Sequence, residues 1–356
     1  TTTAFLNASR DTLLIDVRSP SEYTHAHIPG AVNIPLFNDE ERKVVGTTYK
    51  QNSREEAIKI GLDFFAPKMR KLVEEVEALL KNRVHSTGKE MMVDKRISVY
   101  CWRGGMRSAA IAWLLDLYGF NVSVLTGGYK SYRNLILQSF SYPYKFQILG
   151  GYTGSGKTEV LQELSKKGNA VIDLEEIACH KGSAFGNINM PPQPSQEMFE
   201  NLLGSLLINL IEKDPLQKIW VEDESQRIGN INLPNTFWDT MRMAPIYFLD
   251  IPFEARLDHV ITEYGNLNRD RLKDAILRIS KRLGPLETKM SLEHLENNNI
   301  KDCFSILLKY YDKRYLKGLH NREGLETLLH RIPCKDAIRD NIDLIKPQPI
   351  VYEKNH

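Results

Sequence analysis

Residues 151–158, GYTGSGKT, match the phosphate-binding pattern GxxxxGK[ST] at every fixed position. The apolar run KFQILG precedes this loop and the helix-like run TEVLQELSKKG follows it, which is the strand–loop–helix setting that the pattern requires. In such a loop backbone N–H groups surround a diphosphate, the lysine neutralises charge, and the hydroxyl reaches Mg²⁺. The sequence therefore predicts a diphosphate-binding loop made of Gly151, Gly154, Ser155, Gly156, Lys157 and Thr158. ATP or GTP is the usual ligand, but the loop binds a diphosphate whatever group is attached to it.

Three further strand-like runs follow, AVIDLE (170–175), KIWVED (218–223) and APIYFLDI (244–251), with helix-like segments between them. Strands that alternate with helices predict a parallel sheet, so residues 145–255 are expected to form a P-loop NTPase-like α/β domain. Glu222, Asp223 and Glu224 stand at the end of the second run, and Asp223 is favoured as a metal or water ligand. From about Arg256 strand patterns vanish, and residues 256–356 are expected to form a helical C-terminal region packed on this domain.

An earlier set of four strand-like runs, at 13–18, 31–35, 97–101 and 122–128, also alternates with helix-like segments and predicts a parallel-sheet α/β domain over residues 1–135. Its third strand runs into CWRGGMRS. A cysteine between a strand end and a helix N-terminus lies in a positive field from backbone N–H groups, which lowers a thiol pKa from about 8.5. Cys101 is therefore the candidate nucleophile, in an anion-binding loop formed by Trp102, Arg103, Gly104, Gly105, Met106 and Arg107.

Two classes of enzyme use such a cysteine loop. The stretch DVRSPSEYTHAHIPGAVNIP (16–35) resembles the N-terminal signature of the rhodanese family, whose loop cysteine carries sulfur, and its Asp16 and Arg18 are expected to form an internal ion pair. Sulfur carriers usually place four residues between the cysteine and the next loop arginine, whereas this chain has five between Cys101 and Arg107. Five is the spacing of cysteine phosphatases, although Tyr100 replaces the histidine that often precedes their cysteine. A phosphatase is therefore the alternative at this point.

The chain's 47 basic and 45 acidic residues leave a net charge of +2, so a nucleic-acid partner has to meet a local basic surface. The helical region supplies candidate RNA contacts at Arg278, Lys281, Arg282, Lys313 and Arg314, with tyrosines nearby to stack on unpaired bases. The four cysteines form no CxxC pair, which argues against a zinc site or a disulfide framework. No apolar run approaches the length of about 20 residues that a membrane span needs, so a cytoplasmic protein with no membrane partner is expected.

In chain order, CWRGGMRS, GGYTGSGKTEVL, DLEEIACHKGSAFG (173–186) and WVEDESQRIG (220–229) resemble the motifs of the tRNA 2-selenouridine synthase family. The resemblance extends from about Leu13 to at least Tyr264, and the wider cysteine loop belongs to this family's pattern. It implies two steps at the wobble uridine, position 34, of tRNA that carries 2-thiouridine. Geranyl diphosphate first alkylates the thiocarbonyl sulfur, and selenophosphate then replaces the S-geranyl group to leave 2-selenouridine.

This resemblance suggests a task for each loop. The P-loop is expected to hold the diphosphate of geranyl diphosphate, with Lys157 and Thr158 at the departing pyrophosphate. The Cys101 loop is expected to hold selenophosphate and either to take up selenium or to form a covalent adduct with the base. No tightly bound cofactor is expected, and Mg²⁺ is a candidate ligand. Two alternatives remain: a P-loop NTPase or kinase with a rhodanese sulfur-transfer domain, and a binding or sensor module in which Cys101 is inert.

Overall fold

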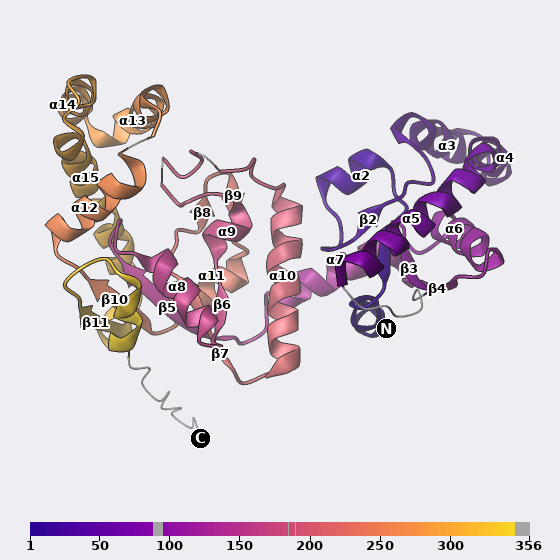
Figure 1. The fold of residues 1–356 in the computed structure, drawn as a ribbon, viewed down its shortest axis with the longest axis horizontal. Helices are drawn as coiled ribbons and strands as arrows, with labels where there is room; N and C mark the ends of the chain where they lie inside the picture. The colour runs from indigo at the N-terminus through magenta and orange to yellow at the C-terminus, as the bar shows by residue number, and fades with distance from the viewer. Residues whose placement is uncertain (88–94, 184, 189, 266, 346–356) are drawn as a thin grey trace. The chain divides into compact units, whose positions relative to one another are not determined.

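The computed structural model describes residues 1–87, 95–183, 185–188, 190–265 and 267–345. Two compact units make up the chain (Figure 1). The first consists of Thr1–Ser139 with Glu200–Ser205, and the second of Phe140–Phe199 with Leu206–His356. Each unit is built around its own parallel sheet, which confirms the α/β class predicted from the sequence.

A four-stranded sheet forms the centre of the first unit. Its order is β2 (Val32–Asn33), β1 (Leu13–Asp16), β3 (Arg96–Tyr100) and β4 (Asn121–Val124). All three pairings are parallel, with Ile15 opposite both Val32 and Val99. Ile15 and Val99 are fully buried in a core that also contains Phe65 and Leu115 from the covering helices. Burial of these apolar side chains is the main stabilising contribution to the sheet.

Helices connect the strands of this unit. They are α1 (Thr2–Ser9), α2 (Pro20–His25), α3 (Asp39–Gln51), α4 (Arg54–Phe65), the short 3₁₀ helix η1 (Ala66–Lys68), α5 (Met69–Thr87), α6 (Met106–Leu117) and α7 (Gly128–Ser139). Helix α2 begins with Ser19 as N-cap and Pro20 in the first turn, where the missing N–H of proline removes no helical hydrogen bond. Glu22 completes a capping box by accepting from Ser19 N at 3.1 Å, which fixes this carboxylate at the start of the helix.

The second unit has a five-stranded parallel sheet. Its order is β11 (Leu329–Pro333), β10 (Ile246–Asp250), β5 (Lys145–Gly151), β7 (Lys218–Glu222) and β6 (Ala170–Ile172). A small antiparallel pair, β8 (Arg227–Ile228) with β9 (Ile231–Asn232), follows β7. Strand β5 lies in the middle of the larger sheet and ends directly at the P-loop. The carboxyl ends of parallel strands meet at one edge of a sheet, so this edge gathers the loops that carry chemistry.

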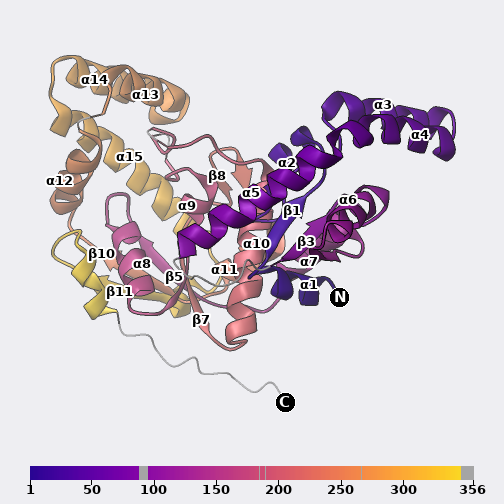
Figure 2. The same cartoon turned by 45° about the vertical axis from the view of Figure 1, so that its right-hand side comes forward.

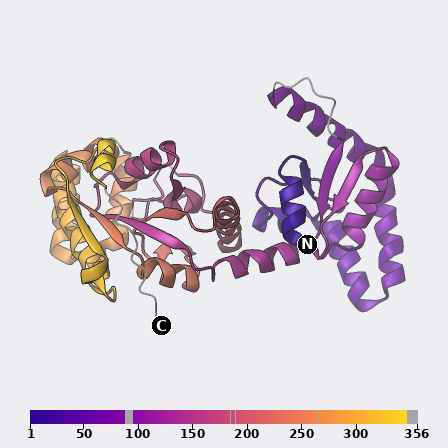
Figure 3. The same ribbon diagram turned by 90° about the horizontal axis from the view of Figure 1, so that it is seen from below.

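Strand β11 corrects the prediction that strands end near Arg256. Residues 329–333 pair in parallel with β10, from Leu329 opposite Ile246 to Pro333 opposite Asp250. Figure 3 shows β11, in yellow, along the edge of the sheet. The segment LHRIP contains a histidine, an arginine and a proline, which are unusual in a central strand. An edge strand tolerates them, because one of its sides has no neighbouring strand. The region from 256 is therefore not wholly helical.

Most of the C-terminal region is nevertheless helical. Helices α12, α13, α14 and α15 gather into one group (Figure 2), around a core that includes Leu257, Ile276 and Phe304. The helices of the second unit are α8 (Lys157–Lys166), α9 (Leu174–Ala178), α10 (Gln196–Lys213), α11 (Asn235–Arg242), α12 (Phe253–Tyr264), α13 (Arg269–Leu283), α14 (Pro285–Glu296), α15 (Ile300–His320), α16 (Leu325–Leu328) and the 3₁₀ helix η2 (Arg339–Leu344). Residues 266 and 346–356 of this region lie outside the described residues. None of the helices described has both the length and the apolar character to cross a membrane.

Candidate functional site

The first glycine loop surrounds the thiol of Cys101 with hydrogen-bond donors. Cys101 directly follows β3 and is only 3% exposed, with its Sγ 3.2 Å from Ser108 Oγ. Burial by itself raises the pKa of this thiol, but the Ser108 hydroxyl and the backbone N–H groups of Ser108, Arg103 and Gly105 donate to the sulfur and lower the pKa below its usual value. The fold therefore favours the thiolate, which is the nucleophilic form of cysteine.

Two glycines allow the loop to close this tightly. Gly104 has a φ of +66°, and a Cβ there would lie 2.4 Å from the carbonyl oxygen of Leu125. Gly128 has a φ of +59°, and a Cβ there would lie 2.3 Å from the carbonyl oxygen of Cys101. The start of α7 supports the loop from outside, since Tyr129 N donates to Cys101 O at 2.8 Å. The cysteine loop and the Gly127–Gly128 turn thus pack backbone against backbone, which only glycine permits.

The two loop arginines have different surroundings. Arg103 is exposed beside the loop. Arg107 is mostly buried and donates through Nη1 to Glu22 Oε2 at 2.6 Å and through Nη2 to Oε1 at 3.4 Å. Burial alone would raise the pKa of Glu22, but the hydrogen bond and charge of Arg107 outweigh burial and lower it. The contact of either arginine with an anion stays a prediction, and Glu22 is a partner that the sequence did not reveal.

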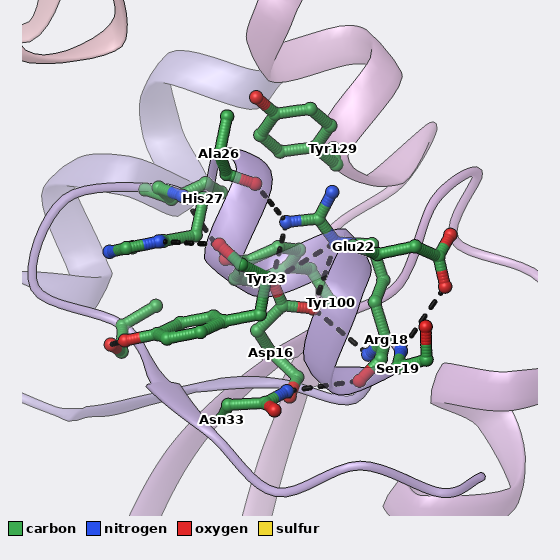
Figure 4. Close-up of polar contacts among 12 residues, drawn as sticks. Asp16, Arg18, Ser19, Glu22, Tyr23, Ala26, His27, Asn33, Tyr100 and Tyr129 are labelled. Atoms are coloured by element: carbon green, nitrogen blue, oxygen red, sulfur yellow. Dashed lines mark hydrogen bonds and ion pairs between the residues drawn. The ribbon is translucent and has the colours of Figure 1, made fainter. Parts of the chain in front are cut away.

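The internal ion pair predicted at the first signature is confirmed. Arg18 and Asp16 are both fully buried, and Arg18 Nη2 donates to Asp16 Oδ2 at 2.6 Å and to the carbonyl oxygen of Ala26 at 2.7 Å (Figure 4). The Arg18 guanidinium also lies 4.0 Å from the centre of the Tyr129 ring. These contacts tie the end of β1 to the residue after α2 and to α7. Their role is to hold this part of the unit together rather than to contact a substrate.

Replacing Ser108 with alanine tests the electrostatics of the thiol. The variant loses one of the donors to the Cys101 sulfur, so we expect its pKa to rise toward that of an ordinary cysteine. The pH profile of thiolate absorption in the ultraviolet, taken as the difference from the Cys101→Ala variant, should move to higher pH. In the parent the thiolate contributes stability above the pKa of the unfolded thiol, and this contribution is lost as the pH falls through the lowered pKa. An unchanged profile would show that Ser108 does not donate to the sulfur.

The second glycine loop joins β5 to α8. Gly156 is the N-cap of α8 with a φ of +70°, and Lys157 Nζ donates to the carbonyl oxygen of Gly151 at 3.1 Å. The Ser155 hydroxyl is buried and, within the part of the chain that the structure describes, has no hydrogen-bond partner. Thr158 is exposed at the first turn of α8. The predicted P-loop residues are thus brought together at a helix N-terminus, which favours an anion.

A buried arginine supports this loop from the helical region. Arg256 donates through Nη1 to the carbonyl oxygen of Thr153 at 3.0 Å and forms an ion pair with Asp312 at 2.7 Å. A Cβ on Gly154 would lie 2.5 Å from Val260 Cγ2, so α12 packs directly against the loop backbone. Arg256 is a functional candidate that the sequence did not single out, because its partners are far away in the chain.

Asp223 belongs to a hydrogen-bond network with Tyr315 and Arg322. Its carboxylate accepts from Tyr315 Oη at 2.6 Å and from Arg322 Nη2 at 2.9 Å. The Tyr315 hydroxyl also accepts from the backbone N–H of Gly151 at 3.3 Å, which links Asp223 to the first residue of the P-loop. A metal or water would have to share this carboxylate with Arg322. The assignment of Asp223 as such a ligand stays a prediction.

Two other carboxyl groups, those of Glu175 and Glu224, lie near the P-loop lysine. Burial raises the pKa of Glu175 to about 10, with further increases from the charges of Glu224 and Glu222 and a decrease from Lys157. Burial also raises the pKa of Glu224, against the charge of Lys157 and a hydrogen bond from Glu175. A Cβ on Gly182 would lie 2.8 Å from oxygens of both Glu175 and Glu224, so a larger residue there would require these carboxyl groups to shift. Glu175 therefore holds a proton that it shares with Glu224 close to Lys157.

The basic residues predicted to contact RNA lie on two helices. Arg278, Lys281 and Arg282 are exposed on the second half of α13, and Lys313 and Arg314 are exposed on α15. Arg278 contacts Asn187 Oδ1 at 3.4 Å, and Arg314 contacts the Tyr310 hydroxyl at 3.2 Å. Their exposure is compatible with a phosphate partner. Contact with RNA stays a prediction.

Both units match known protein families. A family described as "Rhodanese-like domain" matches residues 2–135, and one described as "tRNA 2-selenouridine synthase AAA domain" matches residues 144–331. The chain is 34% identical over 360 residues to the tRNA 2-selenouridine synthase of Nitrosomonas europaea, with 88% of this chain and 90% of that protein covered. It is 35% identical to the protein of that name from Bdellovibrio bacteriovorus, with 87% and 89% covered, and 32% identical to the one from Shewanella frigidimarina, also with 87% and 89% covered.

Proposed function

The chain belongs to the tRNA 2-selenouridine synthase family, and we propose from this premise that it converts 2-thiouridine at the wobble position of tRNA into 2-selenouridine. We propose further that it does so in two steps, with geranyl diphosphate and selenophosphate as co-substrates. The observation that carries the proposal is the pairing of two anion-binding loops, one of them with a cysteine whose pKa is lowered and the other a complete P-loop. Each loop has a separate task in this scheme.

The first step is S-alkylation at the P-loop. Sulfur of the 2-thiouridine forms a bond to C1 of the geranyl group while the C–O bond to the diphosphate breaks. The base loses its N3 proton, and pyrophosphate leaves with the electron pair of the C–O bond and one proton. Lys157, the N-terminus of α8 and the Ser155 hydroxyl, which has no hydrogen-bond partner among the described residues, support this role, because they offer positive charge and hydrogen bonds to a departing diphosphate. Mg²⁺ would bind mainly through diphosphate oxygens with Thr158 as a protein ligand.

The second step exchanges sulfur for selenium at the Cys101 loop. The thiolate attacks C2 of the alkylated base, and the C2–S bond to the geranyl group breaks as geranyl thiol leaves with a proton. Selenium of selenophosphate then attacks C2 and displaces Cys101, and water cleaves the Se–P bond to release phosphate. We favour this covalent adduct over transfer of selenium to the cysteine. Transfer to the thiolate would leave the electron pair on phosphorus, and the scheme contains no oxidant to restore phosphate.

Nucleoside mass spectrometry tests the two steps together. Transfer RNA that carries 2-thiouridine is incubated with the protein and geranyl diphosphate, with and without selenophosphate, and with no nucleotide added. We expect a geranyl mass shift in the absence of selenophosphate and 2-selenouridine in its presence. If neither product forms, with or without Mg²⁺, and the protein hydrolyses ATP instead, the P-loop serves an NTPase or kinase and the proposal fails.

A further inference from the structure

Two large apolar side chains of the predicted anion-binding loop, those of Trp102 and Met106, are exposed and take no part in the two proposed steps. Trp102 is 39% exposed and Met106 is 49% exposed, while Cys101, which directly precedes Trp102, is 3% exposed. An oxyanion needs only the backbone N–H groups and arginines of the loop. Exposed apolar surface of this kind gains about 25 cal/mol for each square ångström that a ligand covers. The loop thus combines anion-binding groups with an exposed apolar rim, which consists of the side chains of Trp102 and Met106.

The rim is held in a defined position. Trp102 stacks at a tilt on Tyr129, with ring centres 5.6 Å apart, and its carbonyl oxygen accepts from Lys130 N at 3.0 Å. Tyr129 is itself fully buried beneath the Arg18 guanidinium. Met106 is the first residue of α6, so its backbone is fixed by the helix while its flexible thioether side chain stays adaptable. A fixed aromatic ring and an adaptable thioether are therefore exposed on the loop that begins with Cys101.

We propose that Trp102 and Met106 bind the geranyl chain of the S-geranyl intermediate during the exchange step, an inference that rests on the proposed function. The chain is attached to the sulfur on C2, the atom that the Cys101 thiolate attacks, so its first carbons must lie within a few bond lengths of the loop. The loop N–H groups and Arg103 attract the selenophosphate anion, and they offer nothing to a hydrocarbon. The two rim residues supply the apolar contact and so select the alkylated base over the unmodified one.

Chain-length selectivity tests this assignment. The substrates are two anticodon stem-loop RNAs, one with S-geranyl-2-thiouridine and one with S-methyl-2-thiouridine, each incubated with selenophosphate. Both groups leave as alkyl thiols, so their reactivity at C2 is similar and the difference in kcat/KM reports contact with the chain. For the unaltered protein we expect a preference for the geranyl substrate of about 30-fold, which equals about 2 kcal/mol. The double variant Trp102→Ala with Met106→Ala should reduce this preference to within about threefold of unity.

A matched control lies on the same helix. Leu117 is 70% exposed on α6 and stands eleven residues after Met106, about 16 Å along the helix axis. Leu117→Ala should leave the geranyl-to-methyl ratio unchanged. Thiolate absorption of the double variant shows whether its cysteine loop is intact. A ratio that stays near the parent value in the double variant would overturn the assignment, whereas failure of the unaltered protein to convert either RNA would instead count against the proposed function.

Discussion

Replacing Cys101 with alanine is expected to abolish selenium incorporation and to leave geranylation intact. In the proposed scheme the thiol with the lowered pKa is the nucleophile that attacks C2 in the second step. Loss of a covalent nucleophile lowers kcat by factors on the order of 10⁴–10⁶. The P-loop, which is proposed to carry out geranylation, lies in the other unit. The measurement is the yield of geranylated and selenated nucleosides from the same tRNA, separated by mass.

The matched control is Cys179→Ala. Cys179 is partly exposed and lies in the second unit, at the C-terminal end of α9 with a φ of +50°. Alanine is strained there to the same degree as cysteine, so the replacement changes little except the thiol. We expect both products at parent levels. If Cys101→Ala also stopped geranylation, the division of the two steps between the two loops would be wrong.

Replacing Lys157 with methionine is expected to have the opposite effect. Geranylation should fall by about 10²–10³-fold, or about 2.7–4 kcal/mol in transition-state stabilisation, because the variant lacks the charge proposed to stabilise the departing pyrophosphate. Conversion of RNA that is already S-geranylated should continue at the parent rate. The fold should persist, because loss of the Lys157 charge raises the pKa values of Glu175 and Glu224 further and lets the pair take up a proton in its place.

Lys166 offers the comparison on the same helix. It lies in the last turn of α8, is exposed, and pairs with Glu163 at 3.5 Å, a surface contact of small energetic value. Lys166→Met removes the same charge from α8 at a distance from the P-loop, and geranylation should be unaffected. Equal losses in the two variants would mean that general electrostatics of the helix, and not contact with the diphosphate, explain the effect.

The sequence predicts the core strands of both sheets well and the edge of the larger sheet poorly. Runs such as ISVYC and KFQILG become β3 and β5 because buried parallel strands need continuous apolar residues. AVNIP shrinks to the two residues of β2, since only Val32 and Asn33 pair with β1. Strand β11 escapes detection because its polar residues and proline suit an edge strand and resemble a loop.

For the candidate sites, local sequence predicts the loops and misses what surrounds them. Each glycine loop is one continuous stretch of sequence, so the spacing of its residues is enough to predict an anion-binding loop. Asp223 has two partners, Tyr315 and Arg322, which lie 92 and 99 residues further along the chain. Glu22, the partner of Arg107, lies 85 residues before it. Such pairs arise only when the fold brings distant elements of the chain together, and no short-range pattern encodes them.

The late position of β11 has a consequence for how the chain is synthesised. The P-loop leaves the ribosome long before residues 329–333, so the growing sheet ends for a time at β10 with unpaired backbone groups. An open edge of this kind is a template for pairing with other chains. Five helices, α12 to α16, must be made before the edge is closed. A fragment that stops at residue 255 would contain both glycine loops and still lack the strand that protects their scaffold from self-association.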